Sequence, residues 1–199
     1  MLVNGNIIGF KKGTIYLDKL IDSTFVSVDS VTIDGTNQFE ISDNNDEVLL
    51  YQIRFGEQII PFFGEKGNIA ITSKLEKLET SYTVSGSKSN DLYNNYKDMQ
   101  RQFNNKKLEL IKTRFEAEQL SDTNQVQELS DEIERLEKKR LLYIANFAKT
   151  NNNSNVSPFV VLLDLSDGHP TLLSKIYNDF TPEVQNSTYG QLLKNYMNN

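Results

Sequence analysis

The chain of 199 residues contains no cysteine and only one histidine, His169. Without cysteine it can form no disulfide and no thiolate nucleophile, and it offers a metal no cysteine ligand. One histidine allows no two-histidine metal site, and any Ser-His-Asp triad would have to use it. His169 lies between Gly168 and Pro170 at the expected start of a helix, which favours a role in the turn. We therefore expect no catalytic residue, no metal site and no cofactor in this chain.

Long hydrophobic runs and positive charge are scarce as well. The longest run, PFVVLLDL at residues 158–165, is far shorter than the roughly 20 residues of a membrane helix and contains Asp164. We expect it to form a buried helix, and we expect no membrane span. The net charge is −6, from 21 basic and 27 acidic residues, and neither half of the chain is basic. Nucleic acid is therefore not expected as a partner, because phosphate binding needs clustered Lys and Arg.

Motifs for phosphates, calcium and export are missing or incomplete. No glycine-rich phosphate loop of the Walker or dinucleotide type is present. Residues 42–47, SDNNDE, offer oxygen ligands but lack the glycine and glutamate spacing of an EF-hand, so a polar loop is the preferred interpretation. The opening MLVNGNIIGF lacks the charged start and apolar stretch of a signal peptide. Either the protein is cytoplasmic, or a leader has been removed.

The first half of the chain consists of short β-branched segments with alternating polarity. Turn residues separate them, which is typical of an antiparallel β-sandwich, and we place this sandwich at residues 1–86. The parity of the apolar residues changes near Asp29 and Ser30, which predicts a bulge or bend. Asp34 and Gly35 then predict a hairpin turn. The expected strands are residues 3–9, 14–20, 25–33, 38–42, 48–55, 58–63, 68–73 and 79–85.

The second half, residues 87–199, has the periodicity of helices. One apolar stripe recurs every three or four residues, at Leu92, Tyr96, Met99 and Phe103. The same helix is expected to continue through Leu108, Ile111 and Phe115. After a break at residues 121–124, a second helix carries a stripe at Val126, Leu129, Ile133 and Leu136, and we expect the two stripes to pack together. The fold class is therefore α+β: a sandwich, a helical hairpin at about residues 89–150, and short helices at about residues 157–199.

The segment IIPFF, residues 59–63, is an apolar cluster with two interpretations. A proline inside a strand suggests an edge or a bulge. The first interpretation is a strand that is buried on both faces. The second is a groove for a ligand or a partner, and its contact residues would be Phe55, Ile60, Phe62 and Phe63.

Three motifs follow one another in the chain. They are DSVTIDGTNQFEI at residues 29–41, PFFGEKGNIAI at residues 61–71 and VSGSKSNDLYNNY at residues 84–96. The set resembles an uncharacterised β-rich N-terminal domain of Bacteroidetes cell-envelope proteins. That domain typically precedes a thioredoxin-like domain of the alkyl hydroperoxide reductase and thiol-specific antioxidant family. The matching residues are Asp29, Ser30, Ile33, Gly35, Phe39, Gly67, Ile69, Ile71, Val84, Gly86, Ser87 and Asn90, with one extra residue between Gly35 and Phe39.

The resemblance implies an exported protein, in the periplasm or anchored to the outer membrane. It implies a non-catalytic interaction or positioning module, belonging to a thiol-disulfide oxidoreductase whose redox domain is absent from this chain. The partners would be an adjoining thioredoxin-like domain or other envelope proteins. No redox residue is carried over, because the chain has no Cys-x-x-Cys. The alternative is a stand-alone envelope protein that captures a peptide or a hydrophobic ligand at a sandwich edge or at the junction of the β and helical parts.

Overall fold

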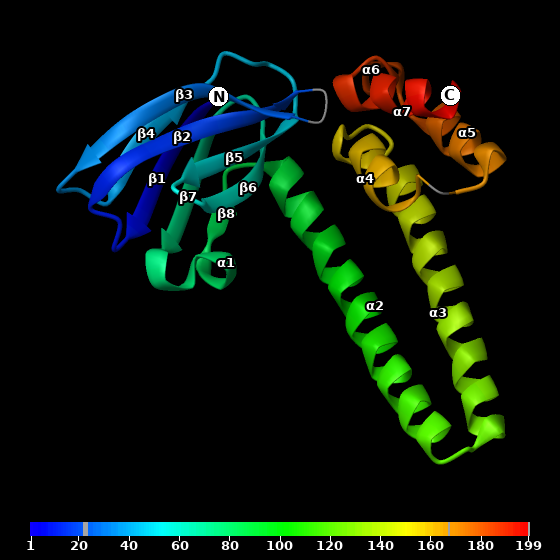
Figure 1. Ribbon diagram of the computed structural model, residues 1–199. Helices are drawn as coiled ribbons and strands as arrows, with labels where there is room; N and C mark the ends of the chain where they lie inside the picture. The colour runs from blue at the N-terminus through cyan, green and yellow to red at the C-terminus, as the bar shows by residue number, and fades with distance from the viewer. Residues whose placement is uncertain (22–23, 167, 199) are drawn as a thin grey trace. The chain divides into compact units, whose positions relative to one another are not determined.

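The computed structural model describes residues 1–21, 24–166 and 168–198, and it shows β-sheets followed by helices (Figure 1). The predicted α+β class is confirmed. The chain divides into two compact units, residues 1–92 and residues 93–199. The predicted division after Gly86 lies slightly earlier, because the first turn of the long helix that follows it is bonded to a strand of the first unit.

The first unit contains two four-stranded sheets, which lie in two layers (Figure 1). Sheet A has the order β4-β1-β7-β8, and sheet B has the order β3-β2-β5-β6. The bounds are β1 (Leu2–Ile8), β2 (Lys12–Ile21), β3 (Thr24–Asp34), β4 (Gln38–Ser42), β5 (Leu49–Phe55), β6 (Gln58–Gly64), β7 (Asn68–Lys74) and β8 (Thr83–Ser85). The first seven agree closely with the predicted segments.

One strand pair departs from the predicted antiparallel arrangement. Strand β1 pairs with β7 in parallel, with Leu2 opposite Asn68 and Ile8 opposite Lys74. Parallel neighbours need a long crossover connection, and here the chain from β2 to β6 provides it. The sequence pattern indicates where strands lie, but it does not indicate that the first strand pairs with one so distant in the chain.

The segment predicted as the eighth strand, residues 79–85, is helical up to Ser81 and forms a strand only from Thr83. Residues Leu75–Lys77 form a 3₁₀ turn, η1, and Leu78–Ser81 form the short helix α1, so that β8 is left with three residues. Leu75 and Leu78 are three residues apart, which is a helical spacing, and Leu78 is buried. The predicted irregularity near Asp29 is confirmed. Leu17 pairs with Asp29 while Asp18 pairs with Ser27, so Val28 is the extra residue of a bulge.

The core of the first unit comes from the strand residues of one parity. The buried apolar residues of this parity in the two sheets include Val3, Ile7, Ile15, Leu17, Ile41, Tyr51, Ile53, Ile69 and Ile71. Gly5 belongs to the same face and leaves room for a ring. A Cβ at this position would lie 1.9 Å from Cζ of Phe39, so the phenyl ring of Phe39 occupies the place of a side chain on β1.

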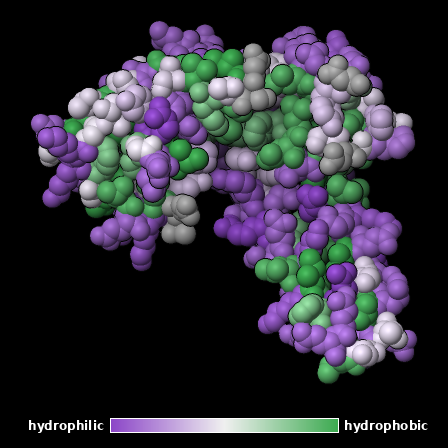
Figure 2. Space-filling model, in the orientation of Figure 1, coloured by the Kyte–Doolittle hydropathy of each residue, from purple (hydrophilic) through white to green (hydrophobic). Residues whose placement is uncertain are grey.

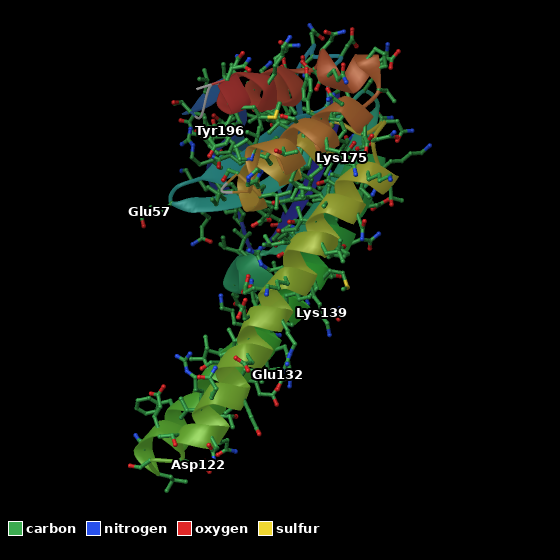
Figure 3. The ribbon with its side chains drawn as sticks, turned by 90° about the vertical axis from the view of Figure 1, so that its right-hand side faces the viewer. Glu57, Asp122, Glu132, Lys139, Lys175 and Tyr196 are labelled. Atoms are coloured by element: carbon green, nitrogen blue, oxygen red, sulfur yellow. The ribbon has the colours of Figure 1, made fainter. Side chains whose placement is uncertain are left out.

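The second unit is built from helices, and its two long ones form the predicted hairpin (Figures 1 and 3). The bounds are α2 (Lys88–Gln119), α3 (Thr123–Thr150), α4 (Val156–Asp164), α5 (Pro170–Asp179), α6 (Pro182–Gln185) and α7 (Thr188–Asn198). The first residues of α2 belong to the first unit. The turn lies at the predicted break, where the Asp122 carboxylate accepts a hydrogen bond from the backbone N–H of Gln125 at 3.0 Å.

The residue that precedes each of the short helices α4, α5 and α6 is polar. His169 precedes α5, and its Nδ1 accepts a hydrogen bond from the backbone N–H of Thr171 at 3.3 Å, which confirms the predicted turn role of this histidine. Helix α4 begins at Val156, one residue earlier than expected. Ser157 lies inside this helix, and its hydroxyl donates a hydrogen bond to the backbone oxygen of Asn151 at 2.7 Å. In the described ranges, no helix has both the length and the apolar character needed to cross a membrane.

Candidate functional site

The two helices of the hairpin face each other along a seam, which is aromatic at the end away from the turn. Tyr96 of α2 lies against Phe147 and Tyr143 of α3, with ring centroids 4.9 Å and 6.0 Å apart. Phe103 lies 5.9 Å from Tyr143. The expected packing of Phe103 against Leu129, Ile133 and Leu136 is therefore wrong. In an antiparallel hairpin, residues at equal distances from the turn meet, and these three aliphatic residues lie closer to the turn than Phe103 does.

The middle of the seam is polar. The Lys107 ammonium lies 2.8 Å from the Glu137 carboxylate, and Arg140 donates to the same carboxylate at 3.0 Å. Arg140 also donates to the side-chain oxygen of Gln100 at 3.3 Å. The hydrogen bond from Lys107, aided by Arg140, lowers the pKa of Glu137 against the opposing effect of partial burial. Polar residues at seam positions of a coiled coil specify its register, at some cost in stability.

Tyr96 also joins the hairpin to the end of α4. Its hydroxyl donates a hydrogen bond to the Asp164 carboxylate at 2.6 Å. Burial of the ring raises the pKa of Tyr96, and the bond to Asp164 raises it further, because both favour the neutral phenol. This tyrosine therefore stays protonated and acts as a fixed donor within the second unit.

Helix α2 carries a second apolar stripe outside the seam, which we call the outer stripe. Its members lie at i, i+3 and i+7 and are Leu108, Ile111 and Phe115. Their exposed fractions are 67%, 38% and 57%. The seam continues instead through Lys107, Leu110 and Arg114, one position earlier at each turn of the helix. The sequence correctly predicts that the helix includes the outer stripe, but its spacing of three and four gives no sign that the stripe faces away from α3.

The outer stripe lies in the half of α2 nearer the turn of the hairpin. Figure 2 shows hydrophobic side chains on this half of the hairpin, bordered by hydrophilic ones. Single exposed apolar residues are common on protein surfaces. Neighbouring ones on successive turns of one helix form a continuous contact surface, and such a surface is typical of an interaction site.

The four residues predicted to contact a ligand lie in the core of the first unit. Phe55, Ile60, Phe62 and Phe63 are each at most 3% exposed. Phe62 stacks on Tyr51 with ring centroids 5.8 Å apart. Phe55 packs against Phe10 at 5.0 Å and also borders a hollow of about 480 Å³ at one end of the sandwich. The interpretation of IIPFF as a strand with both faces buried agrees with Ile60, Phe62 and Phe63, but Ile59 is 49% exposed, so it is wrong for the start of the segment. Ligand contact stays a prediction.

Strand β6 is an edge strand of sheet B, and the first turn of α2 covers part of its edge. The Asn90 side chain accepts a hydrogen bond from the N–H of Phe63 at 2.9 Å and donates one to the carbonyl of Phe63 at 2.7 Å. The amide thus satisfies both backbone groups of Phe63, as a neighbouring strand would. Two residues earlier, Pro61 has no N–H to offer at this edge. An extended peptide would therefore find few backbone partners along β6.

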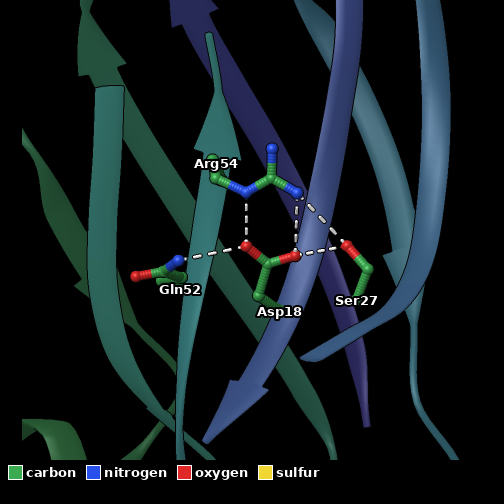
Figure 4. Close-up of polar contacts among 4 residues, drawn as sticks. All are labelled: Asp18, Ser27, Gln52 and Arg54. Atoms are coloured by element: carbon green, nitrogen blue, oxygen red, sulfur yellow. Dashed lines mark hydrogen bonds and ion pairs between the residues drawn. The ribbon is translucent and has the colours of Figure 1, made fainter. Parts of the chain in front are cut away.

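A buried carboxylate on sheet B is fully engaged by neighbouring side chains (Figure 4). Asp18 accepts hydrogen bonds from Arg54 at 2.6 Å and 3.3 Å, from Gln52 at 3.0 Å, and from the Ser27 hydroxyl. Burial alone would raise the pKa of Asp18, but the bonds from Arg54, Ser27 and Gln52 outweigh it, and the pKa lies below its usual value. Arg54 lies over the ring of Tyr16 at 4.3 Å. With both oxygens occupied, this carboxylate serves to bind the strands of sheet B together.

No group of three or more His, Asp or Glu side chains in residues 1–21, 24–166 and 168–198 is arranged to hold a metal ion. Residues 1–93 match the family described as a domain of unknown function (DUF4369). This match spans the first compact unit and ends where that unit ends. It supports the resemblance of the β-rich part to an uncharacterised domain. Comparison with curated proteins and with solved structures gives no match.

Proposed function

We propose that this chain is a non-catalytic interaction module that holds a partner protein on its helical hairpin. The observation that carries the proposal is the outer stripe of Leu108, Ile111 and Phe115, which is exposed while the seam of the same helix is filled. The packing of α2 against α3 uses the seam, so it gives no role to the second apolar stripe. Exposing three large apolar side chains costs solubility, and contact with a partner offsets that cost.

The partner that fits this surface is an amphipathic helix of another protein. Apolar residues at i, i+3 and i+7 form a ridge that packs into the groove of a second helix. Leu108 lies about 30 Å along α2 from Lys88, at 1.5 Å per residue, so the outer stripe is far from the first turn of the helix. The surface around the stripe carries both signs of charge, including Arg101, Lys112 and Glu116. Recognition would therefore rest mainly on apolar contact.

The proposed setting is the cell envelope, within a longer protein that carries a thioredoxin-like domain. This setting is what the resemblance implies. The match of residues 1–93 to DUF4369 supports the resemblance to an uncharacterised domain, from which the setting is inferred. A separate envelope protein would supply the docking helix. Fractionation of the native cells tests the setting: recovery of the protein in the cytoplasm would contradict it.

Site-directed photo-crosslinking tests the interaction itself. A photoreactive amino acid in place of Lys112, which is exposed beside the outer stripe, should give one dominant cross-linked product in the native cells. The cross-linked protein is identified by mass spectrometry, purified and titrated against the pure full chain. We expect Leu108→Ser and Phe115→Ser each to weaken this binding at least tenfold, since each removes a large apolar contact.

The matched control is Leu142→Ser. Leu142 is 61% exposed but lies on α3, outside the outer stripe, so its substitution should leave the affinity unchanged. Equal binding by all three variants would contradict the proposal, as would the lack of a specific cross-link. If the chain forms a homodimer and Phe115→Ser makes it monomeric, the outer stripe serves self-association. That result would also contradict the proposal.

A further inference from the structure

Sheet A has a hollow on its polar face, in the first unit. Its volume is about 550 Å³, within the range of small-ligand sites. The hollow lies across β4, β1 and β7, and it is lined by Asn4, Gly5, Asn6, Thr36, Gln38, Phe39, Glu40, Ile71 and Thr72. Among these lining residues, the side chains on the solvent face of the sheet are amides, hydroxyls and one carboxylate. The lining contains no Lys, Arg or His, and this distinguishes it from an anion site.

The strand register arranges these polar side chains in rows. Gln38 of β4, Asn6 of β1 and Thr72 of β7 lie opposite one another. Neighbouring strands are about 4.8 Å apart, so the row offers hydrogen-bonding groups over roughly 10 Å. Beside it, Asn4 of β1 lies opposite Glu40 of β4 and Ala70 of β7.

Asn6 provides an independent sign of a missing partner. Its side-chain oxygen, Oδ1, is buried and accepts no hydrogen bond from any of the described residues. A buried polar atom without a partner costs free energy, and most such atoms in native proteins are satisfied. A turn of the partly exposed Asn6 side chain would bring this oxygen to a donor in the hollow, such as a hydroxyl or an N–H group of a ligand.

We propose that this hollow binds an uncharged glycan. Sugar hydroxyls both donate and accept hydrogen bonds, so they match a lining of amides, hydroxyls and a carboxylate, and a hydroxyl can donate to the Oδ1 of Asn6. An extended peptide fits less well. Strand β1 lies inside the sheet and is paired with β4 and β7 on its two sides, so it has no free edge for strand addition.

This site is independent of the proposed function, because the hollow lies in the first unit and the outer stripe lies in the second. The test uses the isotope-labelled full chain and NMR titration with cellohexaose, maltohexaose and chitohexaose. We expect at least one of these sugars to give saturable shifts in the side-chain amide signals of Asn4, Asn6 and Gln38. A neutral hexapeptide is titrated in parallel.

Two variants and one control sharpen the result. Asn6→Ala and Gln38→Ala should each raise the Kd of the bound sugar roughly fivefold to tenfold, which corresponds to the loss of one hydrogen bond. Asn6→Ala should do so without lowering the denaturation midpoint, because the side-chain oxygen accepts no hydrogen bond in the free protein. The control is Asn68→Ala, an exposed amide on the same strand face outside the hollow, and it should bind like the wild type.

The lack of saturable shifts with all three sugars overturns the proposal. Saturable binding of the hexapeptide without binding of any sugar overturns it in favour of a peptide site. Binding that Asn6→Ala leaves unchanged also overturns it, since the contact would then lie elsewhere. Saturable binding that both hollow variants weaken and Asn68→Ala preserves supports it.

Discussion

The substitution Asn90→Ala should destabilise the protein by removing both hydrogen bonds between α2 and the edge of β6. Phe63 is fully buried, so its N–H would be left without water or a protein partner. A buried unsatisfied donor costs about 1–3 kcal/mol, and the loss of the hydrogen bond from Asn90 to the Phe63 carbonyl adds about 1 kcal/mol. The carbonyl keeps a hydrogen bond from the Ser87 hydroxyl at 3.3 Å, which limits that second loss. Alanine favours the helix by about 0.5 kcal/mol, so the net loss is about 1.5–3.5 kcal/mol.

Denaturant unfolding measures this loss, followed by far-UV circular dichroism and by the fluorescence of the nine tyrosines. Amide hydrogen exchange at Phe63 gives a local readout, and protection there should fall in Asn90→Ala. A second variant, Asn90→Asp, keeps the side-chain size and the acceptor but loses the donor to the Phe63 carbonyl. It should also be destabilised, which separates hydrogen bonding from volume.

The control for this prediction is Asn105→Ala, an exposed asparagine on the same helix. It should be neutral or slightly stabilising, because it gains helix propensity and loses no hydrogen bond to β6. If Asn90→Ala has the same unfolding free energy as Asn105→Ala and Phe63 stays protected from exchange, the edge of β6 does not depend on Asn90, and the reasoning is refuted.

Three further substitutions test other parts of the structure. Asp18→Asn should cost about 2–3 kcal/mol at neutral pH, below the range for a fully buried pair because Arg54 is a third exposed. The pKa of Asp18 in the folded protein lies below its unfolded value of about 3.9, so the ionised carboxylate stabilises the wild type above that pH. This stability is lost as the pH falls through the folded pKa. The variant should therefore lose less stability in acid, as measured by denaturant titrations. Tyr96→Phe should cost about 2 kcal/mol through the lost bond to Asp164. The pKa of Tyr96 in the folded protein lies above its unfolded value of about 10, so the neutral phenol stabilises the wild type below that pH and this stability is lost at higher pH. The variant should therefore lose less stability in alkali than the wild type. Equal losses would contradict this. Gly86→Ala should cost about 2–3 kcal/mol, because the residue has φ +86° and its Cβ would lie 2.3 Å from a backbone oxygen, and an unchanged thermal midpoint would contradict this.

The parts of this structure that depend on local pattern could be predicted from the sequence. Alternation of period two located β1 to β7, because one face of each sheet is buried and the other is not. The turn at Asp122 followed from its capping residues. The parallel pairing of β1 with β7 could not be predicted in this way, since no local signal links strands that are far apart in the chain.

The candidate site could be predicted only in part. The pairing of Phe103 with Tyr143 follows from the position of the hairpin turn, so counting outward from that turn would have corrected the expected register. Leu108 repeats with the same spacing as the seam but is shifted by one position, and hydrophobic spacing alone does not say which of two adjacent stripes is buried. The contact between Asn90 and Phe63 joins a helix to a strand edge, and no sequence motif predicts it.

The central place of β1 in sheet A has a consequence for the order of folding. Sheet B joins β2, β3, β5 and β6 through pairings between strands that are close in the chain, and these loops close early. Strand β1 needs β4 on one side and β7 on the other, so it stays without its full set of partners until Lys74 has left the ribosome. Such long-range closure slows folding. The earliest strand to be synthesised is thus among the last to be fully paired, and the apolar residues Val3 and Ile7 lack their final burial during that interval.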